Sequence, residues 1–215
     1  MLSGSYFDYY VDCEGHEISH FYEQLESYAR ANSKEDREKI SSNLWDRYGV
    51  EEAVFVLDLS GFSRTAEKHG IVHYLSMIQR MRMTLKPLID HYRGSVVKFE
   101  ADNCFARFLN VRDAIRTGVS YNLTLTAMNL TTPDDLDIHS AIGIDYGKFL
   151  LVNEFDMYGE PVNIASKLGE DTAKAGQILV TQNAIATLGD NGGFNSKSVE
   201  VIVSGMNIKT VEIEY

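Results

Sequence analysis

The sequence contains few cysteines, few prolines and no long apolar run. Its two cysteines, Cys13 and Cys104, lie far apart, and only three prolines occur in 215 residues. Cys104 belongs to the apolar-rich run NCFARF, so we expect a reduced protein with one buried thiol and not a disulfide scaffold. No stretch approaches the roughly 20 apolar residues of a membrane-spanning helix. The N-terminal residues lack the basic start and apolar run of a signal peptide, and a cytoplasmic location is expected.

Basic charge is also scarce in this chain. There are 20 lysines and arginines against 31 aspartates and glutamates, which gives a formal net charge of −11. Nucleic acids and anionic membranes are therefore not expected as non-specific partners, because both are polyanions. A nucleotide held by a few local cations and a metal ion is still compatible with this charge. The length and the 44% hydrophobic content predict one compact domain with an appendage.

The first 50 residues differ from the rest of the chain. In HEISHFYEQLESYARA, apolar and aromatic residues recur at helical spacing. They are Ile18, Phe21, Tyr22, Leu25 and Tyr28. A second helix is expected over KEDREKISSNLW, which follows a possible capping pair and carries acidic residues early. We interpret residues 1–50 as a helical N-terminal extension that packs on the main domain or on a partner subunit.

Strands and helices alternate over residues 51–215. Short apolar runs predict strands, and apolar residues at helical spacing predict helices between them. The expected strands are 53–58, 95–100, 103–108, 137–147, 148–155 and 177–180, with a closing hairpin over 199–215; the expected helices are 62–92, 111–130, 160–176 and 181–189. Gly94 and Gly176 are interpreted as helix ends, and Gly147 as a break between two strands. Locally paired strands mixed with helices predict an α+β fold, a ferredoxin-like α/β sandwich.

The stretch FVLDLSGFS places a carboxylate, Asp58, at the end of an apolar strand. Asp102 lies in the tight connection between the strands VVKFE and NCFARF. If these strands are neighbours, both carboxylates project from one edge of the sheet, where they suit divalent cations that bind phosphate oxygens. The turn with Ser60, Gly61 and Phe62 leads into a helix, so its backbone N–H groups suit a triphosphate. On spacing alone, structural or merely solvated aspartates are the commoner explanation of such a pair.

A third stretch is FDMYGEPVNIASKLGE, residues 155–170. Together with the stretches around Asp58 and Asp102, it resembles the motifs of a known family. Class III nucleotidyl cyclases, the adenylate and guanylate cyclases, typically have a D-I-x-G-F-[ST] start, a K-x-x-G-D turn and a D-x-x-G-x-x-V-N-x-A-[AS]-R helix entry. Here the motifs read DLSGFS, KFEAD and DMYGEPVNIASK, in the same order and at similar separations. Roughly residues 51–215 therefore resemble the class III cyclase catalytic domain.

The resemblance implies an obligate dimer, here a homodimer, with composite sites at the interface. It implies that Asp58 and Asp102 bind two Mg²⁺ or Mn²⁺ ions. It further implies that Lys98 and Asp156 recognise the base and that Asn163 acts on the transition state. Lys98 and Asp102 then serve different sites of the dimer, although they are close in sequence.

Several positions depart from the family pattern. The transition-state arginine of the family falls on Lys167, which keeps the charge but lacks the planar fork that grips two phosphate oxygens. Lys167 is either a phosphate contact or a solvated lysine. The glycine before the second metal aspartate is Ala101, preceded by Glu100, which is either an outward-facing residue or a third ligand. A phosphate-contacting lysine near the C-terminus is replaced by Ser204, and these changes bear on rate more than on fold.

The choice of base follows from hydrogen-bond complementarity. Adenine presents a donor amino group beside a ring-nitrogen acceptor, which an acceptor carboxylate and a donor ammonium match. The pair Lys98 and Asp156 therefore favours ATP over GTP. Cytosine shows the same order of groups as adenine, so these two residues do not exclude CTP.

The leading hypothesis is a homodimeric cyclase that converts a nucleoside triphosphate, ATP first, to the 3′,5′-cyclic monophosphate and pyrophosphate with two Mg²⁺ or Mn²⁺ ions. A pyrimidine-nucleotide cyclase, using CTP or UTP in a bacterial signalling system, is the second. A degenerate nucleotide-binding regulatory module is the third, because Lys167 and Ser204 weaken the phosphate grip.

Histidines show no metal-binding spacing with the cysteines. His69 and His73 are spaced i,i+4 on an expected helix. Without a third ligand in the sequence, they are interpreted as surface residues.

Overall fold

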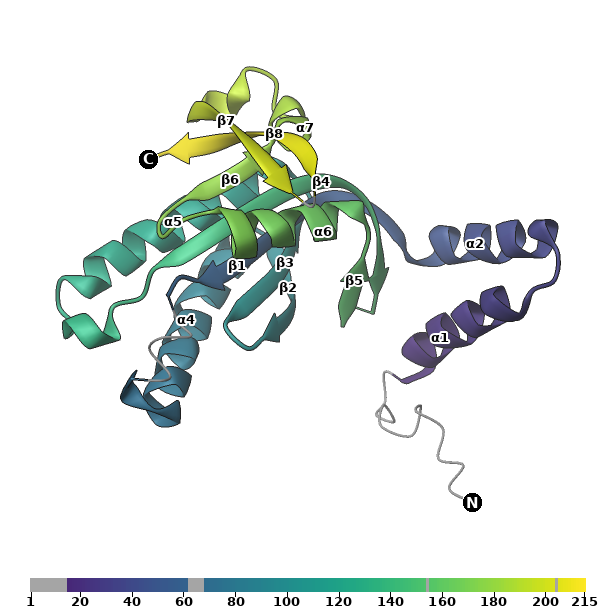
Figure 1. The fold of residues 1–215 in the computed structure, drawn as a ribbon, viewed down its shortest axis with the longest axis horizontal. Helices are drawn as coiled ribbons and strands as arrows, with labels where there is room; N and C mark the ends of the chain where they lie inside the picture. The colour runs from purple at the N-terminus through teal and green to yellow at the C-terminus, as the bar shows by residue number, and fades with distance from the viewer. Residues whose placement is uncertain (1–14, 62–67, 154, 204) are drawn as a thin grey trace.

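The computed structural model describes residues 15–61, 68–153, 155–203 and 205–215. One mixed sheet runs through the molecule in the order β2-β3-β1-β4-β6-β8-β7, with β5 paired to the end of β4 (Figure 1). The strands are β1 Gly49–Leu59, β2 Gly94–Glu100, β3 Asn103–Phe108, β4 Ser140–Val152, β5 Asp156–Tyr158, β6 Ile178–Thr181, β7 Asn195–Val203 and β8 Met206–Glu214. Most pairs are antiparallel, while β4 and β6 are parallel. The predicted α+β fold is confirmed.

The helices lie before and between these strands. They are α1 Gly15–Arg30, α2 Lys34–Tyr48, α4 Ile71–His91, α5 Val111–Asn129, α6 Glu160–Ser166 and α7 Gln182–Ala186, with the π-helical turn η3 Lys167–Thr172 and the 3-10 turns η2 Asp134–Leu136 and η4 Asn191–Gly193. Over the part of the chain that the structure describes, no helix has the length and apolar character needed to cross a membrane.

Strand β1 shows how the sheet separates two layers. Phe55 and Leu57 pack in the main core with apolar residues of α4 and α5, such as Met81 and Ile115. The alternate residues of β1, Val54 and Val56, pack instead with Val162 and Ala165 of α6. Successive side chains of a strand point to opposite faces. Asp58 continues the second series, so it lies on the face of the sheet that α6 covers.

The N-terminal helices form a hairpin at one side of the main domain (Figure 1), and both helices contact β4. Phe21 of α1, Tyr48 of α2 and Val152 of β4 share one buried cluster. Helix α2 begins where the Ser33 hydroxyl accepts a hydrogen bond from the Asp36 N–H at 3.0 Å. The main domain is therefore the packing partner within one chain, whereas the division into residues 1–50 and 51–215 stays a prediction.

Strand β4 is continuous, so the predicted break at Gly147 was wrong. Gly147 lies inside the strand opposite Glu52 of β1. A Cβ atom at this position would come within 2.9 Å of Pro161 Cγ in α6. The glycine is thus explained by the close approach of a helix and not by a turn, and long pairing with β1 keeps the strand intact.

The predicted helix ends also need correction. Helix α4 ends with Tyr92 as its C-cap and Arg93 at φ 60°, while Gly94 already belongs to β2. Gly94 is small because a Cβ there would lie 2.3 Å from the Phe108 ring. The helix expected over 160–176 ends as η3 at Thr172, before Gly176. The expected start of the helix at 62–67 lies outside the described residues.

Candidate active site

The two predicted metal-binding aspartates lie at the same end of neighbouring strands. Asp58 is the penultimate residue of β1, and Asp102 lies in the two-residue turn between β2 and β3. Because Leu57 pairs with Cys104, this antiparallel register brings the turn beside the end of β1. The hydroxyl of Tyr74, on α4, makes a hydrogen bond with Asp102.

Carboxylates dominate the electrostatics around Asp58. The pKa of Asp58 is raised to about 7, first by burial and then by the charges of Asp102 and Glu170. Burial also raises the pKa of Glu170, with Asp171 as the next cause. Like charges gathered at one partly buried place disfavour the ionised forms. A cation bound among them would remove this penalty.

These residues fit hard divalent cations. Asp58 and Asp102 offer carboxylate oxygens, which are the ligands that Mg²⁺ and Mn²⁺ prefer. Burial and, after it, repulsion by Asp102 and Glu170 raise the pKa of Asp58, and a bound cation would offset both effects. The assignment of these two aspartates as ligands stays a prediction.

The turn after Asp58 is only partly described. The Ser60 N–H donates to the His139 carbonyl at 2.9 Å, so this amide group is already bonded. Gly61 is exposed and adopts φ 78°, a conformation in which a Cβ is unfavourable. Phe62 lies outside the described residues. The triphosphate-binding role predicted for Ser60, Gly61 and Phe62 stays a prediction.

The two residues assigned to base recognition lie in contact. Lys98 Nζ is 3.1 Å from Asp156 Oδ1, although 58 positions separate them. The same ammonium group lies 3.1 Å from Glu100 Oε2 and 4.9 Å from the centre of the Phe105 ring. Burial lowers the pKa of Lys98, but hydrogen bonds to Asp156 and Glu100 outweigh it and raise the pKa. Lys98 therefore stays a cation.

A bulge in β2 directs Lys98 to this place. The pairing of β2 with β3 shifts between Val96 and Lys98, so that Lys98 is opposite Phe105. Such a bulge changes which face a side chain points to. Phe105 packs with residues on the α6 face. Lys98 thus reaches the same face of the sheet as Asp58.

The carboxylate of Asp156 is held from several sides. Its Oδ1 accepts the N–H of Met157 at 2.8 Å, and its Oδ2 accepts the hydroxyl of Tyr158 at 2.9 Å. The side chain of Asp156 is 19% exposed, against 30% for Lys98. A partly buried and multiply bonded carboxylate has a fixed direction, which suits it to read a ligand.

Asn163 and Lys167 belong to the helical segment on the same face. Asn163 lies in α6 with an exposed side chain. Lys167 begins η3, and its Nζ lies 3.0 Å from Asp171 Oδ2. Lys167 also lowers the pKa of Glu170, whereas burial and Asp171 raise it more strongly. The roles of Asn163 and Lys167 stay predictions, and Ser204 lies outside the described residues.

The sequence analysis did not identify Glu170, Tyr158 or Tyr22 as parts of these groups. Glu170 lies within the helix predicted over 160–176, and in the structure it belongs to the π-helical turn η3, where its charge raises the pKa of Asp58. Tyr158 could have been found, since it lies two positions after Asp156 on one strand and therefore on the same face. The contact of Tyr22 with Tyr158 depends on tertiary packing and leaves no signal in the sequence.

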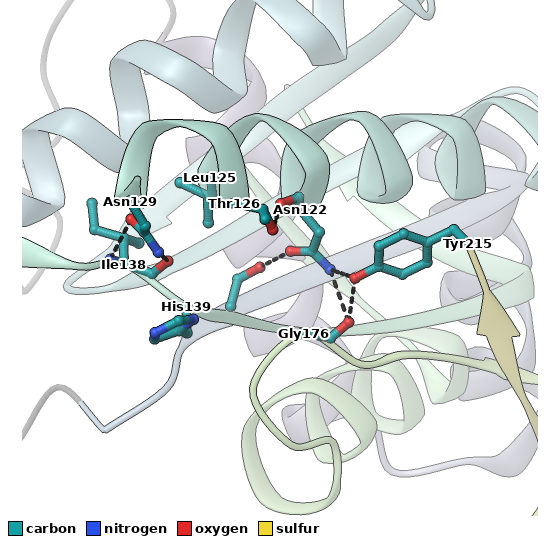
Figure 2. Close-up of a pocket in the computed structure, with 9 residues that line it drawn as sticks. Asn122, Leu125, Thr126, Asn129, Ile138, His139, Gly176 and Tyr215 are labelled. Carbon is teal, nitrogen blue, oxygen red and sulfur yellow. Dashed lines mark hydrogen bonds between the residues drawn. The ribbon is translucent and has the colours of Figure 1, made fainter. Parts of the chain in front are cut away.

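A small polar pocket lies elsewhere, on the α5 side of the sheet (Figure 2). The amide of Asn122 donates to the Gly176 carbonyl at 3.1 Å and to the Tyr215 hydroxyl at 2.8 Å. Ser140 in turn donates to Asn122 Oδ1 at 2.6 Å. None of the predicted site residues lines this pocket. Its polar groups bond to one another, which is typical of a structural network that anchors the C-terminal strand.

Comparison with known proteins identifies the domain type. The family model of the adenylate and guanylate cyclase catalytic domain matches residues 50–214. A protein of Rhizobium meliloti (strain 1021) named "Putative adenylate cyclase 3" is 25% identical over 129 residues, which are 60% of this chain and 22% of that protein. The chain therefore spans under a quarter of the length of this relative.

Solved structures share the fold. The Silicibacter pomeroyi structure named adenylate/guanylate cyclase/hydrolase is 23% identical, with a TM-score of 0.64 over 77% of this chain and 96% of that chain. The adenylyl cyclase CyaB of P. aeruginosa is 17% identical, with a TM-score of 0.64 over 78% of this chain and 96% of that one. The guanylyl cyclase Cya2 is 20% identical, with a TM-score of 0.66 over 77% and 92%. Structures named adenylyl cyclase and structures named guanylyl cyclase are thus both among the neighbours.

Proposed function

Because the chain belongs to the adenylate and guanylate cyclase catalytic domain family, we propose that it converts ATP to 3′,5′-cyclic AMP and pyrophosphate as a homodimer. The observation that carries this proposal is the ion pair between Lys98 and Asp156, with Nζ and Oδ1 3.1 Å apart. Lys98 and Asp156 come from separate motifs and are both assigned to recognition of the base. They lie together on the sheet face that also carries Asp58.

The metal site would use Asp58 and Asp102. Family members typically use two metal ions, and the two carboxylates fit Mg²⁺ or Mn²⁺. Bound divalent cations lower the pKa of a coordinated hydroxyl and offset charge on phosphate. In the reaction, the ribose 3′-oxygen loses its proton and attacks the α-phosphorus, and the bond from that phosphorus to the bridging oxygen of pyrophosphate breaks.

Other residues of the chain would orient the nucleotide. Asn163, exposed on α6, would hold the ribose, and Lys167 would offset charge that develops on the phosphate. Lys167 is bonded to Asp171, so it must exchange this partner for a phosphate oxygen. Such an exchange is possible because the Lys167 side chain is 44% exposed.

The base edge would dock against the paired side chains of Lys98 and Asp156. Adenine offers an amino donor to Asp156 and a ring-nitrogen acceptor to Lys98. Guanine presents the opposite order and leaves a partly buried group unpaired, which costs about 1–3 kcal/mol. Cytosine satisfies the same ion pair as adenine, so a CTP cyclase is the second candidate.

The test is incubation of the purified protein with each of the four ribonucleoside triphosphates and Mn²⁺, followed by chromatography of the products. We expect cyclic AMP as the main product, with cyclic CMP next. Asp58→Ala and Asp102→Ala should each reduce turnover below detection while leaving the circular dichroism spectrum nearly unchanged. Activity retained in either variant would contradict the metal assignment. UTP or GTP as the best substrate would contradict the role of Lys98 and Asp156.

A further inference from the structure

We propose that the N-terminal helix α1 takes part in base selection, through hydrogen bonds from Tyr22 to Tyr158 and from Tyr158 to Asp156. Tyr22 and Tyr158 are positioning residues in this proposal, because they act on the base through the carboxylate of Asp156. The inference rests on the proposed function of Asp156 as a reader of the base.

The direction of the hydrogen bonds is fixed by chemistry. The Tyr158 hydroxyl lies 2.9 Å from Asp156 Oδ2, and a carboxylate only accepts, so Tyr158 donates. The Tyr22 hydroxyl lies 3.2 Å from the Tyr158 hydroxyl. Since Tyr158 has already given its one proton to Asp156, Tyr22 donates to Tyr158. The result is a one-way chain of donors that ends on the base-reading carboxylate, and such chains strengthen each member.

This series of hydrogen bonds also determines which lone pairs of Asp156 face a ligand. Oδ1 is engaged by the N–H of Met157 at 2.8 Å and by Lys98 at 3.1 Å. Oδ2 is engaged by Tyr158, and each carboxylate oxygen accepts about two hydrogen bonds. Oδ2 therefore keeps an acceptor position for the amino group of a base, and the bond from Tyr158 fixes its direction.

Aromatic packing holds α1 in the position from which Tyr22 reaches Tyr158. The rings of Phe21 and Tyr158 stack with centroids 5.7 Å apart and an interplanar angle of 7°. Phe21 is 2% exposed and also meets the edge of Tyr48 in α2. The position of Tyr22, the next residue of α1, is thus set by a buried anchor. Any displacement of α1 would remove the outer donor of the chain.

Hydroxyl-only substitutions separate this role from simple packing. Tyr158→Phe keeps the ring that stacks on Phe21 but loses the proton given to Asp156. Tyr22→Phe removes only the outer hydroxyl. Tyr28→Phe is the matched control, because Tyr28 is a 43% exposed tyrosine on the same helix. The readouts are kcat and KM for all four triphosphates, and the equilibrium affinity for ATP and GTP in Ca²⁺.

We expect Tyr158→Phe to reduce the ATP-over-GTP ratio of kcat/KM by about tenfold, because a hydrogen bond to a charged group is lost. Most of this change should lie in KM. Tyr22→Phe should reduce the ratio by about two- to threefold through the weakened chain, and Tyr28→Phe should not change it. Unchanged selectivity in both Tyr158→Phe and Tyr22→Phe, in an active and folded protein, would overturn the inference while the proposed cyclase function stands.

The binding measurement tests the inference even if the protein shows no catalytic turnover. A wild-type chain that binds ATP selectively but forms no cyclic product would overturn the cyclase proposal alone, and loss of binding selectivity in Tyr158→Phe would still support the chain of hydrogen bonds. A wild-type chain that neither turns over nor binds nucleotides would overturn both.

A second inference rests on a separate group at the start of α4. We infer a Zn²⁺-type site formed by His69, His73 and Asp135. One potential ligand atom from each lies within 4.8 Å of the others. The imidazole rings stack with centroids 4.7 Å apart, and His69 Nδ1 lies 3.9 Å from Asp135 Oδ2. Helix α4 begins only after Gly70, so the predicted i,i+4 helical spacing was wrong, and η2 supplies the third group.

His73 already makes the outer contact typical of a metal-binding histidine. Its Nε2 lies 2.7 Å from the Asp135 carbonyl, which only accepts, so Nε2 carries the proton. Its Nδ1 then has the free lone pair when the ring is neutral. Two imidazoles and a carboxylate form a donor set of Zn²⁺ sites with one open position. The ligand atoms are farther apart than around a bound ion, so this site requires the side chains to rotate toward the ion when it binds.

The test is calorimetric titration of ZnCl₂ into the Asp58→Ala/Asp102→Ala protein in excess Mg²⁺, so that the carboxylate site does not contribute. We expect about one Zn²⁺ per chain and an affinity reduced at least about tenfold by His73→Gln. His91→Gln, which changes a histidine at the other end of α4, should leave the affinity unchanged. Equal zinc binding by His73→Gln and the parent would overturn the site.

Discussion

At the scale of single residues, Asp58 shows a conflict between stability and the proposed catalysis. Its folded-state pKa is raised from 3.8 to about 7, chiefly by burial. A carboxyl whose pKa is raised on folding binds its proton more tightly in the folded state. Ionisation therefore costs stability, and the cost is absent below the unfolded pKa, grows from about pH 4 to 7, and is complete above that.

We predict that Asp58→Asn stabilises the metal-free protein at neutral pH by roughly 1–2 kcal/mol, after allowance for solvent around a half-buried group. Near pH 4 the two proteins should unfold at similar temperatures, since wild-type Asp58 is then protonated when folded. Thermal unfolding in EDTA at several pH values measures this difference. Added Mg²⁺ should stabilise the wild type but not Asp58→Asn, and an equal effect on both would contradict metal binding at Asp58.

A second prediction at this scale concerns the base. Asp156→Ala should narrow the ATP-over-GTP ratio of kcat/KM by about tenfold, because the acceptor for the adenine amino group is removed. Glu100→Ala is the matched control. It removes the other carboxylate that lies 3.1 Å from Lys98 but leaves the base acceptor in place. A uniform fall in rate with all four substrates for Asp156→Ala, without loss of selectivity, would speak against this role.

At the scale of elements, the sequence predicted strands and helices well where pairing or burial follows a simple period. The hairpin of β2 and β3 and the helix α5 lie within a residue of the predictions. The roles of glycines were harder to predict, because a glycine in the sequence can mark either a turn or a place where a neighbouring side chain packs against the backbone. Gly147 and Gly94 each make room for a neighbouring side chain, which only the tertiary structure shows.

The candidate site could be predicted only in part for the same reason. The motifs named Lys98 and Asp156, and the structure places them in contact. The β-bulge that turns Lys98 toward Asp156 has no clear sequence signal. Contacts of Tyr22 and Glu170 arise from the docking of α1 and from the π-helical turn. Periodicity does not report such irregularities.

The packing of α6 and η3 on the sheet gives a prediction at this scale. A Cβ at Gly143 of β4 would lie 2.1 Å from the Ala165 carbonyl and 2.6 Å from the Gly169 nitrogen. Gly143→Ala should therefore displace α6, which carries Asn163, and destabilise the fold by about 3 kcal/mol or more. Chemical denaturation and turnover measure the two effects.

Gly118→Ala is the control for this change. Its Cβ would lie 3.1 Å from the end of the flexible Ile178 side chain, in a helix where alanine is favoured. The expected change in unfolding free energy is within about 1 kcal/mol. Similar behaviour of both variants would show that backbone contact at Gly143 does not position α6.

At the scale of the whole molecule, one face of the sheet carries both groups to which we assign a function. Asp58, proposed as a metal ligand, and Lys98, proposed to contact the base, lie on the face that α6 covers. In one possible arrangement, a nucleotide binds to the metal site and the base site of the same subunit. The proposed homodimer differs, since each nucleotide takes its metals from one subunit and its base contacts from the other.

Subunit complementation distinguishes these arrangements. Asp58→Ala and Asn163→Ala should each be nearly inactive as homodimers. In a heterodimer, one composite site carries both substitutions and the other carries none. A fully exchanged equal mixture has half of its dimers in this form, so the activity should recover to about a quarter of the wild-type value per dimer. Exchange is monitored by energy transfer between labelled subunits. A mixture that exchanges but stays inactive would place each site within one chain, because no wild-type site could then form from two damaged subunits.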